Sequence, residues 1–332
     1  SPRIKETDFM QKEKTIKSVN TSNKERRRLW KAAIKWPLYS VAIMPILIAA
    51  GWKYCIDGNV RWGQFTGFLI ASIFLLLWEN LTNDLFDSET GVDEFKFHSI
   101  VVLIGKPQPV RNLAYGSLFI GLFLILILAL RSDPSVFVLI IGSCSLGYLY
   151  QGPPFRLGYK GLGEPLCWLA FGPLATAAAL LVISPAGEHE IGIPWASAIL
   201  IGSGPALATT LVLFCSHFHQ VVQDALHQKK TPLVRLGTHR ASALVPWLVS
   251  IVFALEWIPI IYGLLPITAL ISAIGLPPAI TLIHLLRKHH NRPELISECK
   301  FLALRFQALN GIGLSLGLAI TPNLGINFGF PS

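Results

Sequence analysis

The chain has 332 residues, of which 52% are hydrophobic and only 14% are charged. Because soluble domains carry about 25% charged residues, this composition excludes an ordinary soluble protein and indicates an integral membrane protein. The net charge of +9 would by itself also suit a nucleic-acid-binding protein. The positions of the charges, described below, argue against that class, and we expect no nucleic-acid partner.

Nine apolar runs are long enough, or nearly so, to cross a membrane as helices. The hydrocarbon core is about 30 Å thick and needs roughly 20 residues of helix. The runs lie at residues 36–54, 62–80, 111–130, 134–150, 164–184, 194–216, 241–259, 263–286 and 298–320. We therefore predict an all-α integral membrane protein with nine transmembrane helices around a central polar site. Residues 1–35 would form a basic, flexible N-terminal segment, 36–325 the transmembrane domain and 326–332 a C-terminal tail.

Basic residues gather on one side of the predicted bundle. Nine spans place the N-terminal segment and every second connection on the same face, and these segments hold 24 of the 28 Lys and Arg residues. The opposite face holds only Lys53, Arg61 and Arg131. Such an asymmetry is typical of multi-pass membrane proteins. It supports the count of nine and indicates that the basic face contacts membrane lipid rather than nucleic acid.

The second apolar run ends in amides and carboxylates, which are costly at a membrane boundary unless something compensates them. Asn80, Asn83, Asp84 and Asp87 are spaced i, i+3, i+4 and i+7, so on a helix they share one face. Converging oxygens suit Mg²⁺, which takes one or two carboxylates and completes its shell with water and substrate phosphates. The motif thus predicts a magnesium site and a phosphorylated substrate. The alternative is a solvated helix end whose acids contact only water.

Residues 94–110 form the next connection, which we expect to be a loop because Pro107 and Pro109 oppose helix. An extended path would let Lys106 and Arg111 return towards the acidic cluster, where they would neutralise a bound phosphate. Both residues would equally well mark only the basic face of the membrane.

The connection at residues 147–164 is rich in glycine, proline and aromatic residues, which indicates an irregular loop. Tyr148 and Tyr150 offer ring faces that would stabilise a positively charged intermediate by about 2 kcal/mol when desolvated. An aromatic belt at the membrane interface is an equally good interpretation of either tyrosine. Arg156 and Lys160 in the same loop are further candidates for binding diphosphate.

A second polar segment follows the sixth run, and its candidate binding residues are His217, Gln220, Asp224, Lys229 and Lys230. Gln220 and Asp224 lie four apart on one helical face, which repeats the placement of the first motif four spans earlier. The lysines offer donors suited to phosphate. Two such motifs suggest one site between two halves of the bundle. Zinc is a weaker interpretation, since His217 and His219 would point apart on a helix.

These motifs resemble those of the UbiA superfamily of intramembrane prenyltransferases, in particular its naphthoate-specific MenA branch. The first resembles the Asp-rich motif of that branch in the form Asn80-x-x-Asn83-Asp84-x-x-Asp87-x-x-x-Gly91-x-Asp93. The second is similar to that of cyanobacterial and plastid members in His217-Phe218-His219-Gln220 and Lys229-Lys230-Thr231-Pro232-Leu233-Val234-Arg235-Leu236-Gly237. The loop between them matches in Gly152-Pro153-Pro154, Leu157-Gly158-Tyr159 and Gly161-Leu162-Gly163-Glu164, and the span that follows matches in Phe171-Gly172-Pro173.

The resemblance implies a UbiA-type bundle and Mg²⁺-dependent transfer of a prenyl group, in this branch phytyl, from its diphosphate to 1,4-dihydroxy-2-naphthoate with decarboxylation. It implies a role in phylloquinone biosynthesis in a chloroplast membrane. The metal ligands it implies are Asn83, Asp84, Asp87, Asp93 and Asp224. The catalytic residues would be Asp84, Asp87, Lys106, Tyr148 and Tyr150. The substrate diphosphate would contact Asn80, Asn83, Lys106, Arg111, Arg156, Lys160, His217, Gln220, Lys229 and Lys230.

The second motif departs from the usual pattern of the branch. Acids or glycine are usual where this chain has Gln220, Val222, Gln223 and Gln228, so Asp224 is left as the single acid. A second Mg²⁺ would be weakly held, and an inactive scaffold is therefore one alternative. Another aromatic acceptor such as homogentisate would keep the chemistry, and a membrane transporter would use intramembrane acids for a different purpose.

Overall fold

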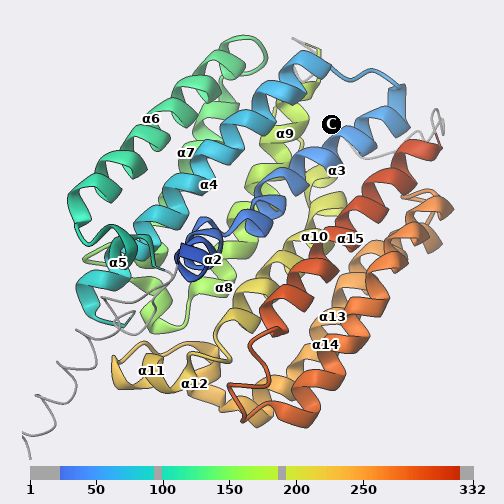
Figure 1. Cartoon of the computed structure of the whole chain (residues 1–332). Coiled ribbons are helices and arrows are strands. Elements are labelled where there is room, and N and C mark those ends of the chain that lie inside the picture. The colour runs from blue at the N-terminus through green and yellow to red at the C-terminus, as the bar shows by residue number, and fades with distance from the viewer. Residues whose placement is uncertain (1–22, 93–98, 186–191, 322–332) are drawn as a thin grey trace, which may run out of the picture.

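The computed structural model describes residues 23–92, 99–185 and 192–321 (Figure 1). Every regular element in this part of the chain is a helix, so the predicted all-α class is confirmed. Eight helical segments are long and apolar enough to cross a membrane, and α7 (Ser135–Gln151) is a shorter apolar helix. Each of the nine predicted runs coincides with one of these segments.

The long spans are α3 (Tyr39–Asp57), α4 (Trp62–Thr90), α6 (Pro107–Leu130), α8 to α9 (Gly163–Ile183), α10 (Trp195–Ser216), α13 (Thr238–Ile261), η4 to α14 (Ile267–His289) and α15 (Cys299–Ile320). The short helices are α2 (Asn23–Ile34), η1 (Trp36–Leu38), α5 (Ile100–Ile104), η2 (Leu157–Lys160), α11 (Val221–Leu226) and α12 (Pro232–Leu236). Helix α2 occupies part of the N-terminal segment that we expected to be flexible. The tail at 326–332 lies outside the described residues.

Helix α4 positions the first polar motif. Its 29 residues span about 44 Å at 1.5 Å per residue, which exceeds the roughly 30 Å hydrocarbon core. The run predicted to end at residue 80 continues as helix to Thr90, through Asp84 and Asp87. It ends at Gly91, whose φ of 76° is the left-handed conformation that glycine adopts at helix ends. The Asp-rich motif therefore lies on the last turns of a helix that extends beyond the membrane core.

The expectation of a loop at residues 94–110 is wrong for the described part of that range. Residues Ile100–Ile104 form α5, and α6 begins at Pro107. At the first helical position the missing N–H of proline costs no hydrogen bond, and Pro109 lies in the same turn. Lys106 is extended, with φ −138° and ψ 137°, as residues before proline usually are. The prolines therefore start a helix instead of preventing one.

Two spans contain breaks in the regular α-helix. The α8–α9 span includes a π-helical turn, η3 (Ala170–Leu174), around Pro173, which cannot donate a backbone hydrogen bond. The η4–α14 span begins as a 3-10 helix, Ile267–Gly275, before it becomes α-helical. Segment η3 packs against α10, and η4 packs against α15. Irregular backbone inside a membrane is tolerated where neighbouring helices bury it, as they do here.

Helix α10 is the most buried of the eight long spans, and it packs against α3, α8, α13 and α15. One hydrophobic cluster fills the space around α3, α4, α7 and α9, and another joins α10, α13, α14 and α15. Figure 1 shows α11 and α12 at the lower left of the bundle and α5 at its left side, and α2 packs against α5. Both polar motifs belong to this end of the bundle, because α4 and α10 lead into it.

Candidate active site

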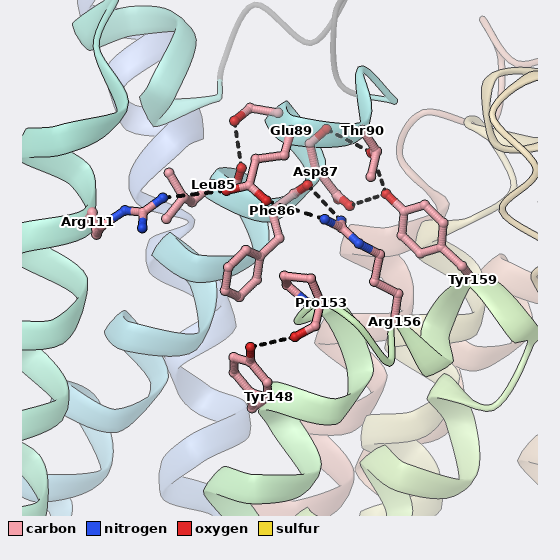
Figure 2. A network of polar contacts seen from close by, with 11 residues as sticks. Leu85, Phe86, Asp87, Glu89, Thr90, Arg111, Tyr148, Pro153, Arg156 and Tyr159 are labelled. Carbon is pink, nitrogen blue, oxygen red and sulfur yellow. Dashed lines mark hydrogen bonds and ion pairs between the residues drawn. The ribbon is translucent and has the colours of Figure 1, made fainter.

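Asp87 lies at the end of α4, where three separate segments of the chain meet (Figure 2). Its carboxylate is buried, and Oδ1 accepts a hydrogen bond from the hydroxyl of Tyr159 in η2 at 2.8 Å. That hydroxyl also lies 2.6 Å from Oγ1 of Thr90. The other oxygen of Asp87, Oδ2, lies 3.8 Å from Nζ of Lys229. Asp87 therefore connects the first motif both to η2 and to the second motif.

Lys229 is the residue that brings the second motif to Asp87. Its backbone N–H donates to the carbonyl oxygen of Asp224 at 2.8 Å, and its ammonium lies 5.1 Å from the centre of the Tyr159 ring. Lys229 and Asp224 are both buried. The backbone N–H of Lys230 donates to the Tyr159 carbonyl oxygen at 2.8 Å. The two motifs, four spans apart in the sequence, thus lie at one place in the fold.

Asp84, one turn before Asp87, has different partners. Its Oδ1 forms an ion pair with Nζ of Lys35 at 2.9 Å, and its Oδ2 accepts from the backbone N–H of Ile100 at 3.3 Å. We predicted Lys35 only as part of the basic N-terminal segment. The signal that would have singled it out is its position directly before the first span, on the face that carries both motifs.

Asn83 adds a buried oxygen on the same helix, one turn before Asp87. Its Oδ1 has no hydrogen-bond partner among the described residues, and neither has Nδ2 of Asn80 one turn earlier. A buried amide oxygen next to carboxylates is a donor set that Mg²⁺ accepts. The described ranges contain no group of three His, Cys, Asp or Glu suited to a metal ion. This fits a cation held by few carboxylates and completed by amide, water and phosphate oxygens. Asp93, another predicted ligand, lies outside the described residues.

The two predicted arginines flank the end of α4, as Figure 2 shows. Arg156 donates from Nη1 to the carbonyl oxygen of Phe86 at 3.0 Å, and its Nη2 lies 3.3 Å from Oε2 of Glu89. Arg111 reaches the other oxygen of the same carboxylate at 3.5 Å. Glu89 thus forms ion pairs with Arg111 of α6 and with Arg156, which directly precedes η2, beside the site.

The predicted lysines differ in burial. Lys106, Lys160 and Lys230 have exposed side chains, whereas Lys229 is buried with its ammonium beside Asp87. Of these four predicted lysines, Lys229 is therefore the one whose ammonium the fold places beside a buried carboxylate of the motifs.

The two predicted tyrosines lie in different environments. The Tyr148 hydroxyl donates to the carbonyl oxygen of Pro153 at 2.6 Å, and its ring packs edge-on against Phe86 with centroids 5.8 Å apart. Tyr150 is buried, and its ring covers Gly158 and Gly163, where any Cβ would collide with it. The fold thus separates two tyrosines to which we assigned one role.

His217 and Gln220 lie just beyond α10. His217 is buried, and its Nδ1 lies 3.4 Å from Oε1 of Glu164 at the start of α8, without hydrogen-bond geometry. Gln220 precedes α11 and accepts the backbone N–H of Asp224 with its carbonyl oxygen at 2.8 Å. Glu164 was quoted only for the resemblance, and the structure gives it a place beside the second motif.

Tyr159 is the third tyrosine of this loop, to which we assigned no separate role, and it contacts Asp87 directly. Burial, and then the neighbouring Asp87 carboxylate, raise the pKa of its phenol well above the usual value. The phenol therefore stays protonated at neutral pH and continues to donate to Asp87. The sequence signal was its place in the glycine-rich loop, between Gly158 and Gly161.

An apolar cavity lies inside the bundle beside this polar end. Its empty space is about 600 Å³, part of which is open space at its mouth, and residues of α3, α4, α7, η3 and the start of α9 line it. Most of the lining side chains are aliphatic or aromatic, and Glu79 of α4 is the one carboxylate among the described residues that line it. Since Glu79 directly precedes Asn80, the cavity adjoins the first motif. We did not predict a role for Glu79.

Comparison with known proteins places this arrangement in a family. Residues 42–305 match the UbiA prenyltransferase family, and the chain belongs to that family. It is 39% identical over 292 residues to 2-carboxy-1,4-naphthoquinone phytyltransferase of Synechocystis sp., covering 88% of this chain and 93% of that protein. It is 37% identical over 298 residues to the chloroplastic 2-carboxy-1,4-naphthoquinone phytyltransferase of Arabidopsis thaliana, covering 88% and 77%.

The solved structure of a UbiA homolog from Archaeoglobus fulgidus, bound to DMAPP and Mg²⁺, has a similar fold. The TM-score is 0.51 at 14% identity, covering 86% of this chain and 98% of that chain. At this identity the likeness concerns the fold alone. The predicted family and the predicted class, an integral membrane prenyltransferase, are confirmed.

Proposed function

We propose that this prenyltransferase transfers a phytyl group from phytyl diphosphate to 1,4-dihydroxy-2-naphthoate, with loss of CO₂, in phylloquinone biosynthesis in a chloroplast membrane. The observation that carries the proposal is the meeting of both polar motifs, through Lys229 and Asp87, beside an apolar cavity. Such a site would bind a charged head at the motifs and keep the reacting carbons of the two substrates in apolar surroundings. The names of the cyanobacterial and plant relatives support phytyl, a naphthalene-ring acceptor and, for the plant protein, the chloroplast.

The proposal includes Mg²⁺, which is bound in the Archaeoglobus structure. In this chain Asn83, Asp87 and Asp224 would hold it, because they are oxygen donors at the place where the motifs meet. Asp84 is the remaining candidate metal ligand among the described residues, and it forms an ion pair with Lys35 in this structure. When bound, Mg²⁺ neutralises charge on a departing diphosphate.

The residues of the chain have separable tasks in this reaction. Lys229 would stabilise the diphosphate as the allylic C–O bond breaks, since its ammonium is buried at the motif junction. The cavity would exclude water, which otherwise captures the allylic cation. The ring carbon that bears the carboxylate then bonds to the allylic carbon. Departure of CO₂ leaves an electron pair that restores the aromatic ring.

The acceptor is proposed in its dihydroxy form because an allylic cation needs an electron-rich partner. Two hydroxyl groups donate electron density into the ring, whereas the carbonyl groups of a quinone withdraw it. With the dihydroxy ring the reaction balances without an oxidant or reductant: the prenyl group replaces CO₂ and diphosphate leaves.

The protein in lipid vesicles tests the proposal with three acceptors, 1,4-dihydroxy-2-naphthoate, homogentisate and 4-hydroxybenzoate, each offered with phytyl and geranylgeranyl diphosphate. We expect phytylation of the naphthoate and loss of turnover when EDTA removes divalent metal. Preference for homogentisate would favour the alternative acceptor. No turnover with any acceptor would favour the scaffold, and transfer without metal would remove Mg²⁺ from the proposal.

Asp87→Ala and Asp84→Ala test the first motif in the same assay. Each should lower turnover about 100-fold or more, because each removes a buried carboxylate from the diphosphate site. Glu294→Gln is the control, since it neutralises an exposed acid in the connection between α14 and α15, away from both motifs, and it should retain activity. Near-normal transfer by both folded Asp variants contradicts the roles proposed for them.

A further inference from the structure

Glu79 is a carboxylate that neither polar motif uses. It lies on α4 directly before Asn80, and its side chain lines the apolar cavity. The carboxylate packs against α7 at Gly147, where an added Cβ would lie 3.3 Å from its Cδ and Oε1. No hydrogen bond or ion pair joins this carboxylate to another residue in the described part of the chain. Glu79 therefore offers its oxygens to the cavity.

A carboxylate in such a place is costly, because apolar surroundings provide nothing to replace its water. The buried Glu256 of α13 shows the usual solution, since its Oε2 accepts a hydrogen bond from Nδ2 of Asn310 at 2.9 Å. Glu79 has no such partner among the described residues, and it lines the cavity. A ligand with a hydrogen-bond donor would supply the missing partner.

We propose that Glu79 binds a ring hydroxyl of the aromatic acceptor, an inference that rests on the proposed function. The chemistry of the two substrates indicates which of their groups contacts Glu79. A diphosphate presents only negative oxygens, which a carboxylate repels, and an isoprenoid tail has no polar group. The hydroxyl groups of the acceptor are the remaining donors. Phe68, Trp78 and Phe171 line the same cavity, and aromatic side chains pack favourably against an aromatic ring.

Glu79 also has a chemical task in this position. As the ring carbon bonds to the allylic carbon, the hydroxyl proton passes to Glu79 and the oxygen becomes a carbonyl. Loss of CO₂ then returns an electron pair to the ring and a negative charge to that oxygen, which takes the proton back. Because Glu79 returns the proton that it accepted, the overall reaction neither consumes nor releases a proton.

Two substitutions separate binding from proton transfer. Glu79→Leu removes both, and we expect the KM for the acceptor to rise about tenfold to a hundredfold, as for a lost hydrogen bond to a charged group. Glu79→Gln keeps an acceptor oxygen but cannot take the proton, so kcat should fall while the acceptor KM changes little. The KM for the prenyl diphosphate should stay within about twofold in both variants, because Glu79 does not contact the diphosphate.

Acceptors whose ring hydroxyls are converted to methyl ethers give a second readout. Wild-type protein should discriminate against the ether that blocks the bound hydroxyl, and Glu79→Leu should lose that discrimination. Glu256→Gln is the matched control, since it alters a buried acid in a span outside the cavity, and it should leave the acceptor KM unchanged. If Glu79→Leu instead alters the preferred prenyl chain length, or leaves the acceptor KM unchanged, the cavity does not hold the acceptor and the inference is overturned.

The comparison uses whichever hydroxylated acceptor the wild-type protein prenylates, so failure of the naphthoate alone would count against the proposed function and not against Glu79. If the protein shows no turnover, the comparison uses binding of 1,4-dihydroxy-2-naphthoate alone. Quenching of tryptophan fluorescence measures this binding. Equal affinity in wild type and Glu79→Leu would overturn the inference there.

Discussion

Asp87 and Lys229 keep each other's charge compensated at a buried position. The carboxylate accepts from Tyr159 at 2.8 Å, and the ammonium lies 3.8 Å from its other oxygen and 5.1 Å from the Tyr159 ring centre. Breaking a buried pair by removing one partner is strongly destabilising, because the remaining charge is uncompensated. At the scale of single residues, stability and proposed chemistry therefore depend on the same three side chains.

Lys229→Ala is expected to lower kcat/KM for the prenyl diphosphate about 100-fold, because a preorganised cation is lost where the diphosphate departs. Lys229→Arg should recover part of the activity, since it restores the charge. Arg240→Ala, an exposed cation on α13, is the control and should behave like wild type. Steady-state kinetics over a range of diphosphate concentrations provide the measurement. A change confined to the acceptor KM would exclude action of Lys229 on the diphosphate.

The raised pKa of Tyr159 predicts that the stability of the protein falls at alkaline pH. Its pKa is raised in the folded protein, by burial and then by Asp87, above the unfolded value of 10.0. The unfolded chain therefore loses this proton first, so the contribution is fully present below about pH 10 and is lost as the pH rises above it. Between pH 9 and 11, Tyr159→Phe should lose less stability than the wild-type protein. Thermal unfolding in detergent at several pH values measures this. Parallel curves would contradict a raised pKa.

Among the helices, close approach at glycine determines how α15 meets η4. Gly317 and Gly313 face the backbone of η4, and a Cβ at Gly317 would overlap the carbonyl oxygen of Thr268. Oγ1 of Thr268 donates to the Gly317 carbonyl oxygen at 2.5 Å. Small residues permit such contacts between membrane helices. The 3-10 helix is thereby held against its neighbour over its length.

Gly317→Ala is expected to destabilise the protein by about 1–3 kcal/mol, because the added methyl group forces α15 and η4 apart. Gly116→Ala on α6 is the matched control: nothing lies near its Cβ position, and alanine favours helix over glycine by about 1 kcal/mol. Thermal unfolding, measured in the same detergent for all proteins, should show a lowered midpoint temperature for Gly317→Ala only. Equal midpoints for the two variants would contradict the packing described here.

For the whole molecule, the charge asymmetry and the position of the site agree. The segments that carry 24 of 28 basic residues include those that supply Lys35, Tyr159 and Lys229 to the polar end. The opposite face has few basic residues. The diphosphate head would thus meet the protein on its basic side, while the apolar cavity extends into the bundle.

This arrangement predicts opposite accessibility for two exposed positions. Arg240→Cys lies on the basic face and Arg131→Cys on the other, so a membrane-impermeant maleimide should label only one of them in oriented, sealed vesicles. Permeabilised vesicles should allow labelling of both, and the unmodified protein reports any reaction of the native cysteines. Labelling of both positions in sealed vesicles would contradict the nine-span topology.

The sequence alone predicted the spans, because apolar length and charge asymmetry are local properties that a membrane enforces. It also placed Asn80, Asn83, Asp84 and Asp87 on one helix through their spacing. It misled at Pro107, since a proline that begins a helix and a proline that prevents one look alike in a single sequence.

Tertiary structure decided which side chains meet. The pairs Lys35 with Asp84 and Tyr159 with Asp87 join residues 49 and 72 positions apart, and no local pattern encodes such contacts. Burial likewise separated Lys229 from the exposed Lys230, although the two are adjacent in the chain. Glu79 acquired its place at the cavity only when α7 packed against α4. Local spacing determines which face of a helix a residue occupies, whereas the packing of the bundle determines what that face meets.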